Sequence, residues 1–159
     1  MGNLYRFCNF DSNRFFGALV IQILEFQAKV KNSIEYNISE TKKFKNYDLE
    51  GTFTDSFGNI GTFGAVIIAD IDNGILVRLD STAENIYSNN ERFYMRGIRE
   101  KSDVDAGIAY NIIIGTTAKL KPLMGTKCTT SVRYLNDAIF GINKCKLNEK
   151  SKKILNNIK

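Results

Sequence analysis

Arginines and aromatic side chains alternate within one short stretch, which offers the most chemistry in the sequence. The stretch contains Arg92, Phe93, Tyr94, Arg96 and Arg99. Aromatic rings can stack on unpaired bases while guanidinium groups bind phosphates. The same residue types are also enriched at protein interfaces. The stretch therefore predicts a surface for a protein or for single-stranded nucleic acid. The simpler interpretation is a core element with one solvated, charged face.

Lysines concentrate at the C-terminal end of the chain. The last 16 residues hold six Lys and one Glu, so they carry the whole formal charge of +5. Lys150, Lys152 and Lys153 are the candidate contacts for a phosphate backbone or an acidic protein surface. With no arginine or aromatic ring among them, a nucleic-acid contact there would not depend on base sequence. Alternatively, these lysines only complement the dipole of a C-terminal helix.

Two pairs of aspartates are weak candidates for a metal site. Asp70 and Asp72 form one pair, and Asp103 and Asp105 form the other. Paired carboxylates can hold Mg²⁺ or Ca²⁺, but the first pair does not match a calcium loop because Gly74 comes one position early. Aspartates are also typical of turns. We therefore predict no cofactor and no metal, and keep a carboxylate-based enzyme or nucleotide sensor as a third function class.

Histidine is absent and cysteine is scarce. Without histidine the chain alone cannot build a Ser-His-Asp or Cys-His nucleophile pair or a zinc site with imidazole ligands. This makes hydrolase chemistry less expected and favours a non-enzymatic protein, while an enzyme that uses Asp, Glu, Lys, Tyr or Cys stays open. Cys8, Cys128 and Cys145 are odd in number and widely spaced, which argues against a disulfide framework or a Cys-x-x-Cys motif. This pattern predicts free, partly buried thiols in a reducing compartment.

No apolar run reaches the roughly 18 residues of a membrane span. The longest, Phe15 to Leu24, is interrupted by Gln22, and no cleavage pattern for a signal peptide follows it. We therefore expect a cytoplasmic protein with no membrane partner. The abundance of Asn, Ile and Lys is typical of an AT-rich genome and suggests a bacterial, phage or mobile-element source.

Hydrophobic periodicity predicts a helix at the N-terminal end. Residues 11–31 place apolar side chains at helical spacing, with Glu25 and Lys29 as a favourable i,i+4 pair. A second helix is expected to begin at Thr129 or Thr130, and a third over residues 148–158. The second would carry apolar side chains at helical spacing, namely Val132, Leu135, Ile139 and Ile142.

The middle of the chain predicts an antiparallel meander. Strands are expected at 33–39, 49–54, 60–69 and 75–79, with turns at 55–59 and at Asn73-Gly74. Asn-Gly between apolar runs is a strong hairpin signal because a type I′ turn needs positive φ at both central residues. Residues 83–101 fit a helix or a strand. Within residues 103–121 a strand from Ile108 to Leu120 is favoured over a helix.

These elements predict an α+β fold. The expected architecture is a single globular domain over residues 1–159, with an N-terminal helix, a central β-meander and two C-terminal helices on one face of a single sheet. The leading functional hypothesis is a small non-enzymatic protein-interaction module, a subunit of a larger complex or an inhibitor that docks onto one. The alternatives are an RNA- or single-stranded nucleic-acid-binding protein and the carboxylate-based enzyme or sensor.

Overall fold

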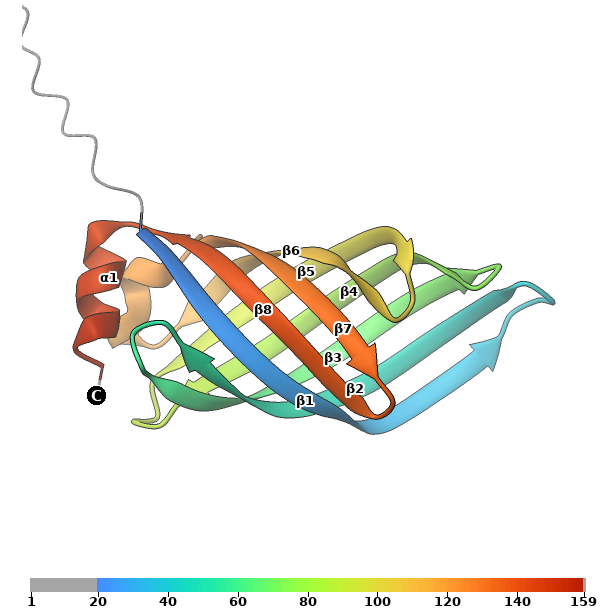
Figure 1. The fold of residues 1–159 in the computed structure, drawn as a ribbon, viewed down its shortest axis with the longest axis horizontal. Coiled ribbons are helices and arrows are strands. Elements are labelled where there is room, and N and C mark those ends of the chain that lie inside the picture. Colours follow the sequence, from blue (N-terminus) through green and yellow to red (C-terminus); the bar gives the residue numbers. More distant parts are fainter. Residues whose placement is uncertain (1–19, 159) are drawn as a thin grey trace, which may run out of the picture.

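The structure is a computed structural model that describes residues 20–158, and it is a closed antiparallel barrel with one short helix (Figure 1). Each strand pairs with the next along the chain, and β8 returns to pair with β1. The strands are β1 (Val20–Asn37), β2 (Lys42–Asp55), β3 (Ile60–Asp72), β4 (Ile75–Tyr87), β5 (Arg92–Asp103), β6 (Ala106–Thr116), β7 (Lys127–Leu135) and β8 (Ala138–Leu147). The 3₁₀ helix η1 (Ala118–Leu123) and the α-helix α1 (Glu149–Asn156) complete the fold.

Closure of the barrel is visible in the partners of β1. Leu24 lies opposite Asp55 of β2 on one side and opposite Asn143 of β8 on the other. Closure leaves no unpaired sheet edge along this part of β1, which removes a site for edge-to-edge association. Short turns suffice for most connections, since every neighbouring pair of strands is antiparallel, and only the β6–β7 connection is longer and contains η1.

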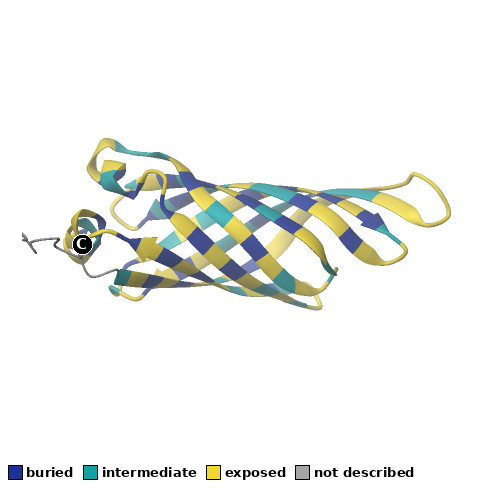
Figure 2. Cartoon of the chain, turned by 90° about the horizontal axis from the view of Figure 1, so that it is seen from above, coloured by how far each residue is buried: buried dark blue, intermediate teal, exposed yellow. Residues whose placement is uncertain are grey.

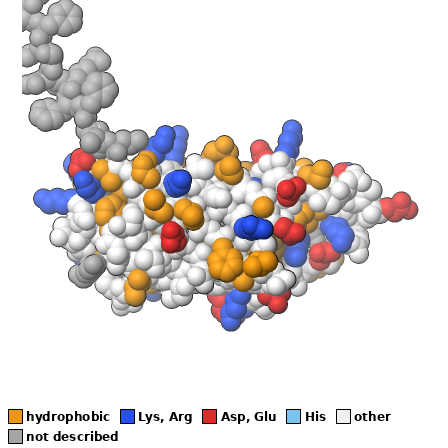
Figure 3. Space-filling model, in the orientation of Figure 1, with side chains coloured by type: hydrophobic (Ala, Val, Ile, Leu, Met, Phe, Trp, Pro, Cys, Tyr) orange, Lys and Arg blue, Asp and Glu red, His pale blue; other side chains and the backbone are white. Residues whose placement is uncertain are grey.

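Side chains alternate between the interior and the outer surface along each strand (Figure 2). On β3, for example, Ala65, Ile67 and Ala69 are buried, whereas Val66 and Ile68 between them are exposed. This is the period-2 pattern of a sheet with one buried face. The outer surface carries charged side chains of both signs interspersed with hydrophobic ones on the face shown in Figure 3.

The interior is divided into two buried clusters. One lies at the end that carries η1 and α1, where Leu120, Leu123 and Leu155 are completely or almost completely buried. The other lies at the opposite end and includes Leu76 and Leu79. The helix α1 is fixed over its end by hydrogen bonds from Ser151 Oγ and from Asn59 Nδ2 to main-chain carbonyls (2.8 and 2.9 Å). Of the described residues, no helix is long and apolar enough to cross a membrane.

The β1–β2 hairpin projects beyond the barrel at the end away from α1 (Figure 1). Residues 31–40 are all exposed, and in this part β1 pairs with β2 but no longer with β8. Ile34, Tyr36 and Ile38 are each more than half exposed. The prediction of a strand over 33–39 is confirmed as far as Asn37, where β1 ends.

The α+β prediction is wrong, because the molecule is almost entirely β. The predicted N-terminal helix 11–31 falls partly outside the described residues, and from Val20 onward the chain is β1. Helix-favouring residues such as Glu25 and Lys29 lie on the outer surface of this strand. Pairing with two neighbouring strands outweighs their weak intrinsic helix preference.

The helix predicted from Thr129 or Thr130 is also absent, and β7 and β8 form a hairpin there instead. The hairpin turns at Asn136, whose φ is +54°. This pairing places Cys128 opposite Cys145, and the two are joined by a disulfide. The expectation of free thiols is therefore wrong for these two cysteines, and Cys8 lies outside the described residues.

Most predicted β elements are confirmed, as is the final helix. The strands expected at 49–54, 60–69 and 75–79 lie within β2, β3 and β4, and β6 covers most of the strand expected from Ile108. Asn73 and Gly74 have φ values of +50° and +76°, the backbone of the predicted turn. The ambiguous segment 83–101 is the end of β4 and most of β5. Helix α1 begins after Asn148, whose side chain caps the Ser151 N–H.

Candidate functional site

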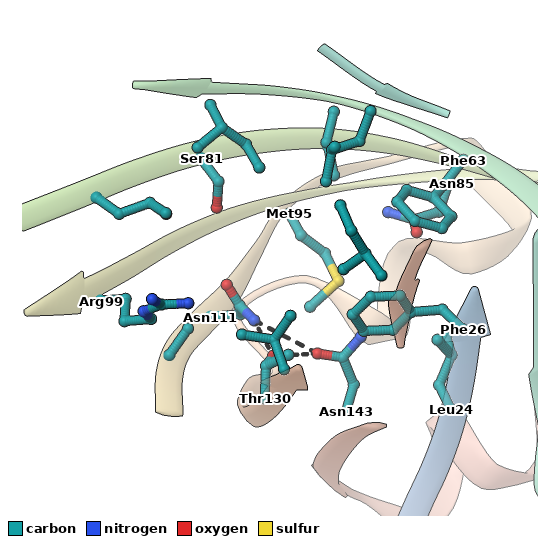
Figure 4. Close-up of a pocket in the computed structure, with 18 of the residues that line it drawn as sticks. Leu24, Phe26, Phe63, Ser81, Asn85, Met95, Arg99, Asn111, Thr130 and Asn143 are labelled. Atoms are coloured by element: carbon teal, nitrogen blue, oxygen red, sulfur yellow. Dashed lines mark hydrogen bonds between the residues drawn. The ribbon is translucent and has the colours of Figure 1, made fainter. Parts of the chain in front are cut away.

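An internal cavity of about 110 Å³ lies between the two buried clusters (Figure 4). Its walls are mostly aliphatic and aromatic, with a few polar groups among them. The lining residues are Leu24, Phe26, Leu49, Phe63, Ala65, Ile67, Leu79, Ser81, Ala83, Asn85, Met95, Arg99, Ala109, Asn111, Thr130, Val132, Tyr134, Ile139 and Asn143. Every one of the eight strands contributes, so the cavity belongs to the barrel lumen as a whole.

The cavity exists because small residues stand at inward positions. Ala65, Ala83 and Ala109 line it where larger aliphatic side chains would fill the space. Gly97 on β5 has a related role, since a Cβ there would lie 1.8 Å from Asn111 Oδ1. Glycine therefore lets the Asn111 side chain lie across β5 inside the lumen.

Three polar side chains form a chain of hydrogen bonds on one wall. Asn111 Nδ2 donates to Thr130 Oγ1 and, at 3.4 Å, to Asn143 Oδ1, while the Thr130 hydroxyl donates to the same Asn143 oxygen (Figure 4). These residues come from β6, β7 and β8. Their mutual bonds allow polar groups to be buried in an apolar lumen, and they offer amide and hydroxyl groups to anything that enters it.

Arg99 is the most unusual group in the lining. It is only 2% exposed, and in Figure 4 it lies beyond Asn111, on the side away from Leu24 and Phe26. Its guanidinium donates to Ser102 Oγ at 2.9 Å and to the main-chain carbonyls of Asp103 and Val104 at 2.5 and 2.8 Å. Gly107 leaves room for it, because a Cβ at that position would lie 2.8 Å from Arg99 Nε.

Two tyrosines lie near Arg99. The Tyr47 and Tyr134 hydroxyl oxygens are 2.9 Å apart. Burial raises the pKa of both hydroxyls, and the nearby positive charge of Arg99 only partly offsets that effect. Both tyrosines are therefore neutral at physiological pH.

A second buried polar cluster lies at the α1 end, where the Asp55 carboxylate is fully engaged but Asn59 Oδ1 accepts no hydrogen bond from the described residues. The Asp55 carboxylate accepts hydrogen bonds from Gln22 Nε2 at 3.1 Å, from the Tyr87 hydroxyl at 3.2 Å and from the main-chain N–H of Phe57 at 2.9 Å. Asn59 donates to it through both its main-chain and side-chain nitrogens. Burial, and then the nearby Asp55 charge, raise the pKa of Tyr87. This cluster fixes the 55–59 turn beneath α1.

The predicted arginine-aromatic surface is divided between the two faces of β5. Phe93 and Arg99 are buried in the lumen, whereas Arg92 and Arg96 are exposed on the outer surface. Arg92 and the Tyr94 hydroxyl both contact Glu84, each at 2.9 Å. The five residues therefore do not form one surface, because neighbouring residues of a strand point in opposite directions.

The predicted basic residues near the C-terminus lie on α1. Lys150 and Lys153 are exposed and Lys152 is half-buried. Other basic residues, which the sequence reasoning did not single out, gather on the outer surface of β6 to β8. There Lys127, Lys144 and Lys146 line a shallow groove with Arg96 and with Tyr110, which is 71% exposed.

The four candidate aspartates are not gathered into one cluster. Asp70 and Asp72 end β3, Asp103 ends β5, and Asp105 lies in the turn that follows. Within residues 20–158, no three His, Cys, Asp or Glu side chains gather where they could hold a metal ion.

The sequence reasoning missed most of the polar groups in the lumen. It selected Arg99, but for an outer surface, and it did not select Asn111, Thr130, Asn143, Tyr47 or Tyr134. One signal was available: Asn111 occupies an inward position between Ala109 and Ile113, so it is a polar residue on an apolar face.

Comparisons with protein-family models, with curated proteins and with solved structures gave no significant match to this chain.

Proposed function

We propose that the barrel binds one small, largely apolar molecule in its lumen. The observation that carries this proposal is the internal cavity, which has apolar walls and a few polar groups directed into it. Such a combination is typical of small-molecule sites. An eight-stranded barrel is just wide enough either to be filled by its own side chains or to hold one small ligand.

The lining residues favour a lumen that holds a small ligand over a lumen that is filled by the protein's own side chains. Side chains around a void lose van der Waals contacts that a filled core would give them, so an empty cavity lowers the stability of the protein. Ala83 and Ala109 line the cavity from strands β4 and β6, and a larger aliphatic residue at either position would fill it. A bound molecule would supply the missing contacts without such a replacement.

The first experiment measures stabilisation by a small aromatic probe. Toluene at about 100 times its Kd is expected to raise the Tm by about 5–10 °C. Ala109→Leu is expected to abolish the shift, because it fills the cavity. Ile108→Leu is the matched control, since Ile108 precedes it on β6 and is 58% exposed. Absence of a shift with toluene and with nitrobenzene in the wild-type protein would rule out the proposal.

The outer groove favours nucleic-acid binding as a second candidate function. Cross-strand pairing places Arg96, Ile112 and Lys127 in one row across β5, β6 and β7. A neighbouring row contains Tyr110 and Lys144, each paired with Thr129. Among the described residues Lys127 and Lys144 have no ion pair. Lysines beside an exposed aromatic ring are suited to a single strand.

A labelled oligonucleotide tests this candidate. Binding is expected at about 50 mM salt and should weaken steeply towards about 200 mM. Lys127→Glu with Lys144→Glu should remove it, whereas Lys31→Glu on the projecting hairpin, which also reverses a basic charge, should leave it unchanged. An oligonucleotide that is not retained at low salt would exclude this function.

The expected protein partner and the cytoplasmic location stay predictions. Exposed apolar side chains for a partner are available on the projecting hairpin at Ile34, Tyr36 and Ile38, and a pull-down combined with size-exclusion chromatography tests for a protein partner.

For the location, the Cys128–Cys145 disulfide favours an oxidising compartment over the cytoplasm. Alkylation of free thiols in freshly lysed source cells would show whether Cys128 and Cys145 are oxidised there, and so decide between an oxidising compartment and the cytoplasm.

A further inference from the structure

The charge of Arg99 has no partner of opposite sign in the part of the chain that the structure describes. Among the described residues no carboxylate lies within ion-pair distance of its guanidinium. Its three hydrogen bonds go to a hydroxyl and to two main-chain carbonyls, and Asp103 takes part only through its carbonyl. A guanidinium cannot lose its proton in a protein, so the positive charge stays inside the barrel.

Some of the hydrogen-bonding capacity of Arg99 is also unused. Its Nη1 amino group makes no hydrogen bond to any residue in 20–158 and is not itself fully buried, although Arg99 as a whole is 2% exposed and lines the cavity. Buried charged groups are normally paired. The hydroxyls of Tyr47 and Tyr134, on which the Arg99 charge acts, are bonded to one another at 2.9 Å. An oxyanion beside Arg99 would accept a hydrogen bond from Nη1 and another from the Tyr134 hydroxyl, which lines the same cavity.

The rest of the cavity limits what this anion carries. Phe26, Phe63 and Met95 line it together with small aliphatic residues, so the remainder of the molecule is apolar. The volume of about 110 Å³ is of the order of the roughly 150 Å³ cavity that takes up benzene in an engineered protein. Met95 is an adaptable side chain that can adjust to the shape of an occupant.

We infer that the ligand of the lumen is a small organic carboxylate, with its charged oxygens against the Arg99 guanidinium and its apolar body between Met95 and the two phenylalanine rings. This inference rests on the proposed function and specifies the class of molecule. The carboxylate supplies the missing counter-charge, and the guanidinium offers it short, charge-assisted hydrogen bonds.

The decisive comparison uses the wild-type protein with two probes of the same shape. Benzoate and nitrobenzene are nearly isosteric, but only benzoate carries a net charge. Titration calorimetry at neutral pH is expected to show benzoate binding about 10- to 100-fold more tightly, the range for hydrogen bonds to a charged group. Ala109→Leu should block both probes, which locates the binding in the lumen.

Arg99→Met then removes the charge while keeping much of the side-chain volume. It should lose the preference for benzoate and still bind nitrobenzene. Arg96→Met is the matched control, because Arg96 lies on the same strand but on the outer surface, and it should behave as wild type. Tyr134→Phe, which should weaken benzoate but not nitrobenzene, is the second variant if Arg99→Met does not fold.

The possible results separate this inference from the proposed function. If wild type binds nitrobenzene as tightly as benzoate, or if Arg99→Met keeps the preference, the carboxylate assignment is wrong while ligand binding in the lumen stands. If neither probe binds, the proposed function fails and the carboxylate assignment fails with it.

Discussion

Tyr47 and Tyr134 share a hydrogen bond that crosses the barrel lumen. Their hydroxyl oxygens are 2.9 Å apart, although Tyr47 lies on β2 and Tyr134 on β7, with β1 and β8 between them in the sheet. The bond therefore joins strands that share no main-chain hydrogen bonds. It holds two polar groups next to Arg99, inside a lumen that is otherwise mostly apolar.

Tyr47→Phe is expected to lower the free energy of unfolding by about 1 kcal/mol, because the Tyr134 hydroxyl loses its partner within the barrel. Urea denaturation measures the change. Tyr110→Phe is the control, since Tyr110 is 71% exposed on the outer surface, and it should change stability by less than about 0.5 kcal/mol. Equal effects of the two substitutions would show that the bond across the lumen does not stabilise the barrel.

Alkaline pH is expected to destabilise the barrel through its buried tyrosines. The pKa of Tyr47, Tyr87 and Tyr134 is raised in the folded protein, chiefly by burial, whereas tyrosines of the unfolded chain ionise near pH 10. Below about pH 10 both states keep these protons and the contribution to stability is complete. Above it only the unfolded state loses them, so stability falls as the pH rises.

Tyr47→Phe makes this pH dependence measurable. Each tyrosine that keeps its proton in the folded state but loses it in the unfolded state lowers the free energy of unfolding by about 1.4 kcal/mol per pH unit. Between about pH 10.5 and 11.5, the free energy of unfolding of the variant should therefore fall by that much less than in wild type. Parallel curves for the two proteins would mean that Tyr47 ionises in the folded state as it does in the unfolded chain.

Reduction of the Cys128–Cys145 disulfide is expected to lower the free energy of unfolding by about 3 kcal/mol, from the loop entropy of a 17-residue separation. Urea denaturation with and without a reductant tests this, and Cys128→Ser with Cys145→Ser should match the reduced protein. As a check on the pairing, one free thiol is expected in the unreduced, denatured chain of three cysteines. Three free thiols would contradict the pairing.

Gly97→Ala is expected to lower the free energy of unfolding by about 1–3 kcal/mol, since its Cβ would lie 1.8 Å from Asn111 Oδ1 and 2.6 Å from Ser81 Oγ. The Asn111 side chain must then move, which disturbs its bonds to Thr130 and Asn143. Gly64→Ala is the matched control, because its Cβ would lie no closer than 3.8 Å to another atom. Comparable losses in both variants would refute a specific role for Gly97.

The central strands could be predicted from the sequence because their signals are local. Residues 60–69 alternate or run apolar, and Asn73-Gly74 supplies the turn that β3 and β4 need. The strand and turn assignments there follow from steric preferences of a few neighbouring residues. No comparable signal shows that β8 returns to pair with β1, since their partners are far apart in sequence.

The two wrong helices have different causes. In β1 both faces carry apolar residues, such as Ile23 outside and Leu24 inside, so the strand alternation was hidden and helical spacing fitted equally well. Between β7 and β8 the turn at Asn136-Asp137 was overlooked. With that turn placed, Cys128 and Cys145 lie equally far from it on opposite strands, which is the register of their disulfide.

The candidate site was only partly accessible to sequence reasoning. Arg99 could be selected as a residue with chemistry, but its environment depends on which way β5 faces and on what crosses the lumen. Tyr47 and Tyr134 are 87 residues apart in the chain, and no local pattern connects them. Burial turns Arg99 from an ordinary surface cation into a charge that lacks a partner among residues 20–158.

By itself the sequence determined the turns, most of the central strands, the C-terminal helix cap and the absence of histidine chemistry, because each depends on residue type or on neighbours within a few positions. The tertiary structure alone decided that the strands close into a barrel, that Cys128 meets Cys145, and that small residues from different strands leave a cavity beside Arg99. These features depend on pairing between distant segments, whose combined hydrogen bonds and burial exceed the local preferences of any one segment.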